Sequence, residues 1–330
     1  MRIALVCTAH GFGHLTRQLA IGRELVARRA SPTVFTAATL VEDPLPRVTW
    51  AVDVGLAQRD SLREDLDRTR VLLEERCSER AIDAIAAALA PYDVVVADTA
   101  PTALEAARRA GVRAVAVGNF DWAWIYGHYP ALADWATRFA AWQAPHEGLE
   151  LWPGPGLRGF RHVERVGLVA RPGAGERVAG RVLVSFGGFG LDGLADWLPR
   201  IAGVRWLLAP PMPRIEREDC DWAEGVRFPD LVARAQVVLT KPGYGIFAEC
   251  AAAGTRIVWL DRGSFPEAPF MEAAMLARGD VKVVGRDVST AIREALARPM
   301  PTPVVADGAG RVAARLLREA GGTPSPRKPA

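Results

Sequence analysis

Short runs rich in β-branched residues alternate with helix-like segments in the first half of the chain. Five runs predict strands, at residues 2–7, 31–37, 48–54, 93–98 and 113–119. Segments rich in Ala, Arg, Glu and Leu lie between several of them and have helical periodicity, at 15–29, 61–90 and 101–110. Strands that are separated by helices pair in parallel, with helices on both faces of the sheet. We therefore predict a doubly wound α/β unit.

The same alternation starts again in the second half. Runs at 181–188, 204–210, 225–228, 235–241 and 255–261 predict a second series of strands, and residues 245–254 predict a helix between two of them. A chain of 330 residues also exceeds the usual size of a single hydrophobic core. The fold class predicted is α/β, with two doubly wound, Rossmann-like domains that face each other across a cleft.

Residues 148–180 separate the two series. This stretch is dense in Gly and Pro and poor in periodicity, which is typical of a linker. We expect an N-terminal domain at 1–165, a C-terminal domain at 166–320 and a flexible tail at 321–330, where three prolines occur in ten residues. The helix expected before the tail is a candidate to pack back across the domain junction.

Charge and composition exclude several classes of partner. The 41 Lys and Arg residues and 38 Asp and Glu residues are mixed along the chain, without a basic run that would follow a nucleic-acid backbone. No apolar stretch has membrane-spanning length, so we expect a cytoplasmic protein without a transmembrane segment. The four cysteines lie far apart without CxxC spacing, which fits a reducing compartment and indicates no metal site.

The turn "HGFGH" at residues 10–14 follows the first predicted strand. Its glycines, Gly11 and Gly13, lack the GxGxxG spacing of a dinucleotide-binding turn, so a nicotinamide cofactor is not expected. The glycines would let backbone amides face a ligand, and His14 would point into the cleft as a proton-transfer group. A histidine that caps the helix, or a turn that only packs tightly, are the alternatives.

Two turns of the second half can hold a phosphate. Residues 185–190 close a strand with three glycines, and residues 240–254 run from a strand through a Pro-Gly-Tyr-Gly turn into a helix. The N–H groups of a helix N-terminus favour a diphosphate at Gly243 to Ile246 without a metal ion. Glu249, one turn into that helix, could reach ribose hydroxyls or could be a solvated charge. Glu267 could hold sugar hydroxyls or cap the next helix.

Residues 219–221, "DCD", match the Asp-x-Asp of metal-dependent sugar transferases only superficially. They lie in a charged segment, and we expect a solvated loop without a metal ion.

Several of these segments together resemble a known family. Residues 10–17, 53–69, 93–126 and 240–271 look like the glycosyltransferase-like domain that precedes the sugar kinase in plant L-arabinokinases. More distantly, the two halves resemble the N-acetylglucosaminyltransferase that forms lipid II and the wider GT-B glycosyltransferases. The resemblance spans residues 3–285 in order. We expect no kinase domain after it, since 330 residues leave no room for one.

The resemblance implies roles for individual residues. It places His14 beside the acceptor, Gly187, Gly188, Gly243, Tyr244 and Gly245 in the donor phosphate loops, Glu249 at the donor ribose and Glu267 near the donor sugar. Asp98 and Asp121 are the acids expected to orient His14 or to replace it as the base. Gly11, Gly13, Arg17 and Trp122 are expected on the acceptor side. Trp122, Trp124 and Tyr126 could stack on a sugar ring or belong to the core.

The expected function is transfer of a sugar from a nucleoside diphosphate donor, UDP or a similar pyrimidine nucleotide, to an unidentified small-molecule or glycan acceptor. The resemblance implies a hexosyl- or N-acetylhexosaminyltransferase that inverts the anomeric carbon and needs no metal or other cofactor. A first turn with fewer glycines than the lipid II enzyme implies a different acceptor. A nucleotide-sugar hydrolase and a non-catalytic nucleotide-sugar-binding module remain alternatives.

Overall fold

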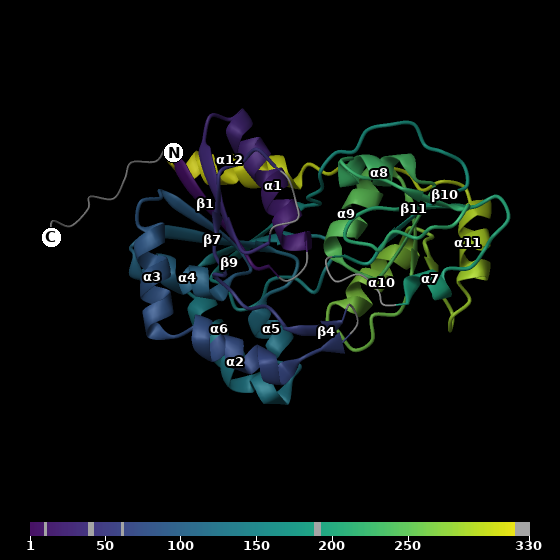
Figure 1. Cartoon of the computed structure of the whole chain (residues 1–330). Coiled ribbons are helices and arrows are strands. Elements are labelled where there is room, and N and C mark those ends of the chain that lie inside the picture. Colours follow the sequence, from purple (N-terminus) through teal and green to yellow (C-terminus); the bar gives the residue numbers. More distant parts are fainter. Residues whose placement is uncertain (10–11, 39–42, 61–62, 188–192, 321–330) are drawn as a thin grey trace.

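A computed structural model describes residues 1–9, 12–38, 43–60, 63–187 and 193–320. The chain forms two parallel sheets, each covered by helices, in two lobes that lie side by side (Figure 1). The two-lobed α/β fold predicted from the alternating pattern is confirmed.

The first sheet has seven parallel strands in the order β3-β2-β1-β6-β7-β8-β9. Every residue of β6 is buried, as expected of a central strand covered on both faces. A separate antiparallel pair is formed by β4 (Gln58–Asp60) and β5 (Arg63–Glu64). The strands of the sheet are β1 (Arg2–Cys7), β2 (Ser31–Thr36), β3 (Arg47–Thr49), β6 (Val94–Asp98), β7 (Arg113–Gly118), β8 (Glu147–Leu151) and β9 (His162–Gly167).

The second sheet has six parallel strands in the order β12-β11-β10-β13-β14-β15. Its central strand, β13, is buried throughout, and Thr240 at its end pairs with Ser185 of β10. The strands are β10 (Arg181–Ser185), β11 (Arg205–Leu208), β12 (Cys220–Trp222), β13 (Val237–Thr240), β14 (Arg256–Trp259) and β15 (Val281–Lys282).

Helices connect the strands and cover both sheets. Side-chain caps begin several of them: Asp65 accepts from the N–H of Arg68 at the start of α2, and Ser78 accepts from the N–H of Ala81 at the start of α3. The helices are α1 (Phe12–Ala27), α2 (Leu66–Arg76), α3 (Glu79–Leu89), α4 (Pro101–Arg109), α5 (Trp122–Tyr126), the 3₁₀ helix η1 (Pro130–Leu132), α6 (Ala133–Gln143), α7 (Leu194–Trp197), α8 (Phe228–Arg234), α9 (Tyr244–Ala253), α10 (Ala268–Ala277), α11 (Val288–Ala297) and α12 (Gly308–Ala320).

Three predicted segments differ from the structure. Residues 148–180, expected as a linker, include most of β8 and all of β9, and the glycines and prolines that suggested a linker lie mainly in the connections before and after β9. Residues 225–228 do not form a strand but lead into α8. The edge strand of the second sheet is β12 instead, in the charged segment expected to be a loop, where Asp219 pairs with Arg217 and Asp221 with Arg205.

The last described helix returns to the first lobe. Figure 1 shows α12 beside α1, and α12 also contacts β9. A buried apolar cluster continues from one sheet to the other and includes Leu5 of β1 and Leu183 of β10. The two lobes therefore share a core along α1, α9 and α12. None of the helices described is long and apolar enough to cross a membrane.

Candidate functional site

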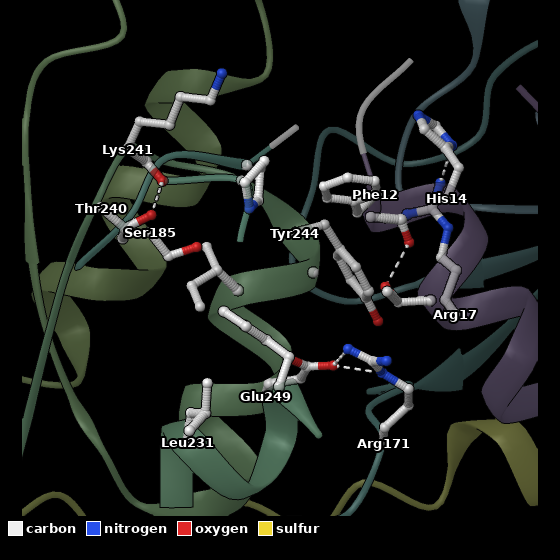
Figure 2. A pocket seen from close by; sticks show the side chains of 18 of the residues that line it. Phe12, His14, Arg17, Arg171, Ser185, Leu231, Thr240, Lys241, Tyr244 and Glu249 are labelled. Carbon is white, nitrogen blue, oxygen red and sulfur yellow. Dashed lines mark hydrogen bonds and ion pairs between the residues drawn. The ribbon is translucent and has the colours of Figure 1, made fainter. Parts of the chain in front are cut away.

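A cavity of about 850 Å³ lies between the two sheets. In parallel α/β sheets, ligands bind beyond the carboxyl ends of the strands. Residues of both lobes line this cavity, among them His14 and Arg17 of α1 and Ser185, Thr240 and Glu249 of the second lobe. Figure 2 shows these side chains around the space where α1 approaches α9.

The N-termini of α1 and α9 meet at the cavity. A Cβ atom on Gly245 would lie 3.0 Å from the Cα of Gly13, so the two turns approach more closely than most side chains allow. Both glycines line the cavity. Because a helix N-terminus carries unpaired N–H groups and a partial positive charge, two of them at one cavity favour an anionic ligand.

His14 lies in the first turn of α1 and contacts Asp98 at the end of β6. The His14 Nδ1 and Asp98 Oδ1 atoms are 2.9 Å apart. The His14 imidazole lines the cavity, whereas Asp98 is fully buried behind it. The pair is thus arranged as a histidine with an acid that orients it.

Arg17 holds the same carboxylate. Its Nε donates to Asp98 Oδ2 at 2.6 Å and its Nη2 donates to Oδ1 at 2.5 Å, while Nη2 also lies 2.8 Å from His14 Nδ1. A guanidinium can only donate, so Nδ1 cannot accept from Arg17 and also donate to Asp98. We assign the Nδ1 proton to the bond with Asp98, because the carboxylate is the stronger acceptor. In this tautomer, Nε2 carries the lone pair that can take a proton.

Burial and Arg17 set the charge states of the pair. Burial lowers the pKa of His14, and the positive charge of Arg17 lowers it further, against the opposing effect of Asp98. Burial alone would raise the pKa of Asp98, but Arg17 and His14 together bring that pKa below its ordinary value. At neutral pH the site therefore combines a neutral imidazole with an ionised carboxylate.

Aromatic rings support the His14 ring from behind. Phe120 meets it edge to face, with ring centroids 5.9 Å apart, and Trp122 lies at 6.2 Å. Trp122 is fully buried and, unlike Phe120, does not line the cavity. Expected on the acceptor side, Trp122 instead belongs to a core cluster with Tyr126. Because neither Trp122 nor Tyr126 lines the cavity, neither ring is placed to stack on a sugar there.

Asp121 has a structural role at the start of α5. Its Oδ1 accepts from the N–H of Trp124 and its Oδ2 from the N–H of Arg158, each at 2.8 Å. It does not line the cavity. The sequence predicted two acids for His14, but the structure brings only Asp98 to it, while Asp121 caps a helix.

The second lobe supplies the turn at the opposite wall. Gly187 has a positive φ of 76°, and Gly243, just before α9, has an open space where a Cβ would lie. Tyr244 is buried, and its hydroxyl oxygen accepts from the N–H of Val169 at 2.9 Å. The Arg17 guanidinium lies over its ring, 5.1 Å from the ring centre. Tyr244 thus supports the site rather than presenting its hydroxyl to a ligand.

Glu249 forms a buried ion pair that the sequence did not predict. Its Oε1 accepts from Arg171 Nε at 2.7 Å and lies 2.6 Å from Arg171 Nη2 (Figure 2). Burial raises the pKa of Glu249, and the charge of Arg171 opposes that rise. Both residues line the cavity, so Glu249 is not a solvated helix charge.

Glu267 connects the two lobes. Its Oε1 accepts from Asn119 Nδ2 at 2.6 Å, across the cleft, and its Oε2 accepts from Arg262 Nη1 at 3.2 Å. The residue is at the N-cap position of α10 but makes no side-chain capping bond. Burial lowers the pKa of Arg262, and its guanidinium lies 3.7 Å from the centre of the Phe265 ring.

Two predicted site residues, Gly11 and Gly188, lie outside the described residues, as do His10 and the tail 321–330. Over the part of the chain that is described, no group of three or more His, Cys, Asp and Glu residues is arranged to hold a metal ion.

Asn119, Arg171 and Arg262 are among the charged and polar residues of the cavity wall that sequence reasoning missed. Asn119 follows β7 directly, and Arg262 comes shortly after β14. The rule that ligands bind beyond strand ends could have selected both. The same rule could not have selected Arg171, because this residue lies in the connection between the two sheets and not at the end of a predicted strand.

Comparisons with known proteins agree with this architecture. No family model matches the chain. Its sequence is 28% identical over 360 residues to L-arabinokinase of Arabidopsis thaliana, a match that covers 96% of this chain and 34% of the relative. The chain thus spans about a third of that relative's length.

Solved structures match over nearly the whole chain. The glycotransferase of kitacinnamycin is 19% identical, with a TM-score of 0.65 and coverage of 96% of this chain and 98% of that one. The glycosyltransferase SnogD from Streptomyces nogalater is 16% identical, with a TM-score of 0.60 and coverage of 97% and 99%. With its two facing parallel sheets and these matches, the chain has the fold of the GT-B glycosyltransferases.

Proposed function

We propose that this protein transfers a sugar from a nucleoside diphosphate donor to a hydroxyl group of an acceptor. The observation that carries the proposal is the His14–Asp98 pair, with Nδ1 and Oδ1 2.9 Å apart, at a cavity where two helix N-termini meet. A base and an anion-binding wall on opposite sides of one cavity are what such a transfer needs.

In the proposed step, His14 Nε2 takes the proton of the acceptor hydroxyl, and Asp98 stabilises the imidazolium that forms. The acceptor oxygen forms a bond to the anomeric carbon of the sugar. The bond from that carbon to the diphosphate oxygen breaks, and its electron pair leaves with the nucleoside diphosphate. Attack on the face opposite the leaving group inverts the anomeric carbon.

The second lobe would hold the donor. The diphosphate fits at Gly243 to Gly245, where the N–H groups of α9 meet its negative charge without a metal ion, and the side chain of Lys241 also lines this wall. Glu249 would accept from the ribose hydroxyls, and Glu267 would accept from hydroxyls of a hexosyl or N-acetylhexosaminyl group. A uridine or similar pyrimidine nucleotide is the donor we propose.

A binding screen and two variants test this proposal. Thermal shifts with uridine, guanosine, thymidine and adenosine diphosphates and their sugars should favour one base, because a ligand at a hundred times its Kd stabilises the folded state by about 2.7 kcal/mol. Glu249→Ala should mainly weaken donor binding. His14→Ala should keep donor affinity and lower turnover by about 10² to 10⁴, the usual effect of removing a general base.

Product analysis decides what the acceptor is. Donor consumption that requires an added hydroxyl compound supports transfer, whereas free sugar released in buffer alone shows that water is the acceptor. Equal shifts for all nucleotides, or a His14→Ala protein that folds and turns over at the wild-type rate, would contradict the proposal.

A further inference from the structure

A continuous chain of hydrogen bonds crosses the cleft. It runs from Arg262 to Glu267, then to Asn119, to Arg17 and to Asp98, where it meets His14. These side chains come from both lobes, and all are at least nine-tenths buried. The negative charges of Glu267 and Asp98 alternate with the positive charges of Arg262 and Arg17, and Asn119 is the neutral link in the middle.

The orientation of the Asn119 amide is fixed by its two partners. Its Oδ1 accepts from Arg17 Nη1 at 2.9 Å, and its Nδ2 donates to Glu267 Oε1 at 2.6 Å. A guanidinium only donates and a carboxylate only accepts, so the reversed amide would satisfy neither partner. The orientation of the amide therefore depends on both lobes.

The backbone of Asn119 is held as well. Its carbonyl accepts from the N–H of Gly156 at 3.1 Å, and a Cβ on Gly154 would come within 2.2 Å of the same oxygen. With its main chain fixed by this close packing, Asn119 can respond to a change at Glu267 only through its side chain. That side chain contacts the arginine that holds Asp98.

We propose that Asn119 is a positioning residue that transmits the state of Glu267 to the His14–Asp98 pair through Arg17. The inference rests on the proposed function for its meaning: a donor sugar whose hydroxyls bind Glu267 competes with Asn119 for Oε1. When Asn119 loses that partner, its hydrogen bond with Arg17 changes. The positions of Asp98 and His14, which both contact Arg17, then change as well. The base then responds to whether a sugar is present, not only a nucleotide.

A ligand-free mutant cycle tests the link. The chain has five histidines, so the ring ¹⁵N signals of His14 can be identified as those lost in His14→Gln. We expect Glu267→Gln to move these signals clearly further in the wild-type background than when Asn119 is replaced by Ala, where only the direct effect of the Glu267 charge on His14 remains. Equal movement in both backgrounds would mean that Glu267 acts only through space and would overturn the proposal, as would no movement in the wild-type background.

Gln18 provides a matched control. Its Nε2 also donates to Asp98 Oδ2, at 3.2 Å, but Gln18 is not a link between Asp98 and Glu267. In a Gln18→Ala background, Glu267→Gln should move the His14 signals as it does in wild type. Should Asn119→Ala fail to fold, Asn119→Leu replaces it, because leucine has nearly the shape of asparagine and can hydrogen-bond to neither Arg17 nor Glu267.

A second arm uses UDP and UDP-glucose as probes. UDP-glucose should move the His14 signals further than UDP does, and this difference should vanish in the Asn119 variants while calorimetry still detects UDP-glucose binding. A difference that persists in the variants would overturn the proposal. If neither probe binds, the donor assignment fails, and the ligand-free cycle still decides the role of Asn119.

Discussion

The Arg171 guanidinium and the Glu249 carboxylate form an ion pair inside the cavity, with Nη2 2.6 Å from Oε1. Arg171 comes from the connection between the two sheets, and Glu249 from the second turn of α9. Both Arg171 contacts are to Oε1. The pair therefore fixes the direction of the carboxylate, and in the proposed function Oε2 is the atom that would accept from a ribose hydroxyl.

We predict that Arg171→Met removes the preference for ribose. UDP should bind more weakly to this variant, and the advantage of UDP over 2′-deoxy-UDP in calorimetry should shrink toward none. The control is Arg177→Met, since Arg177 lies in the same connection but bonds to Ala235, Ala253 and Thr255. A preference that survives in Arg171→Met would show that Glu249 is oriented without the arginine.

Asp98→Asn should destabilise the protein far more than His14→Ala does. Removing the carboxylate leaves the buried Arg17 charge without its ion-pair partner, and breaking a buried pair on one side costs about 3 to 5 kcal/mol. Urea unfolding measures the difference. Because the folded-state pKa of Asp98 is below its unfolded value, this stabilisation is present at neutral pH and is lost as the pH falls through the folded pKa. The difference in the free energy of unfolding between wild type and Asp98→Asn should therefore disappear only at acidic pH.

As the pH is lowered, the turnover rate should begin to fall only below the ordinary pKa of histidine. Burial and the charge of Arg17 place the pKa of His14 below 6.5, so the imidazole stays neutral at pH 7. A pH–rate profile with saturating donor and acceptor, or with water as acceptor, checks this. An acidic limb with its midpoint above 6.5 would mean that Asp98 dominates over burial and Arg17.

Asp53→Asn should stabilise the protein at neutral pH but not in acid. Burial raises the pKa of Asp53 from 3.8 to about 7, although the Val54 backbone, Thr102 and Arg76 oppose the rise. Between these two values the folded state holds a proton that the unfolded state has lost, so the free energy of unfolding falls by about 1.4 kcal/mol for each pH unit gained. Because asparagine does not titrate, Asp53→Asn should not show this fall in the free energy of unfolding. Melting temperatures of both proteins across pH 4 to 8 should diverge as the pH rises.

Gly243→Ala should affect ligand binding, whereas Gly245→Ala should affect stability. A Cβ on Gly243 meets nothing within 4 Å and its φ of −176° suits any residue, so this variant should keep its melting temperature. It should nevertheless bind a nucleoside diphosphate more weakly, because the methyl group enters the space for the phosphates. Gly245→Ala brings a Cβ to 3.0 Å from the backbone of Gly13 and should lower the melting temperature. Unchanged diphosphate affinity in Gly243→Ala would move the phosphate site elsewhere.

The sequence predicted most of the strands that lie inside the sheets, but not β8, which falls in the stretch expected to be a linker. β1, β6 and β13 are continuous apolar runs because both faces of each strand are covered, and such runs are recognisable without a structure. The edge strands β9, β12 and β15 were also missed. β9 is mostly exposed or half-buried and carries His162, Glu164 and Arg165, so its composition resembles that of a loop.

Strand ends and glycine-rich turns were the sequence features that identified the candidate site residues. His14, Asp98, Glu249 and Glu267 all lie where the alternation of strands and helices placed them. Their partners depend on tertiary structure: Arg17 and Asp98 are 81 positions apart, and Asn119 and Glu267 are 148 apart. Asp121 shows the reverse difficulty, since an aspartate just before a helix serves equally well as a cap or as an acid.

The return of α12 to the first lobe determines how the lobes can move. The chain crosses between them twice, after β9 and again before α12, and the two crossings are joined where the N–H of Gly308 donates to the carbonyl of Leu168 at 2.9 Å. A Cβ on Gly308 would lie 2.7 Å from that oxygen, so the crossings are in direct contact. Two connecting segments that are bonded to each other at one edge of the molecule form a hinge with a single axis. We therefore expect the cleft to open by rotation about that edge, a motion that would have to break the bond between Asn119 and Glu267.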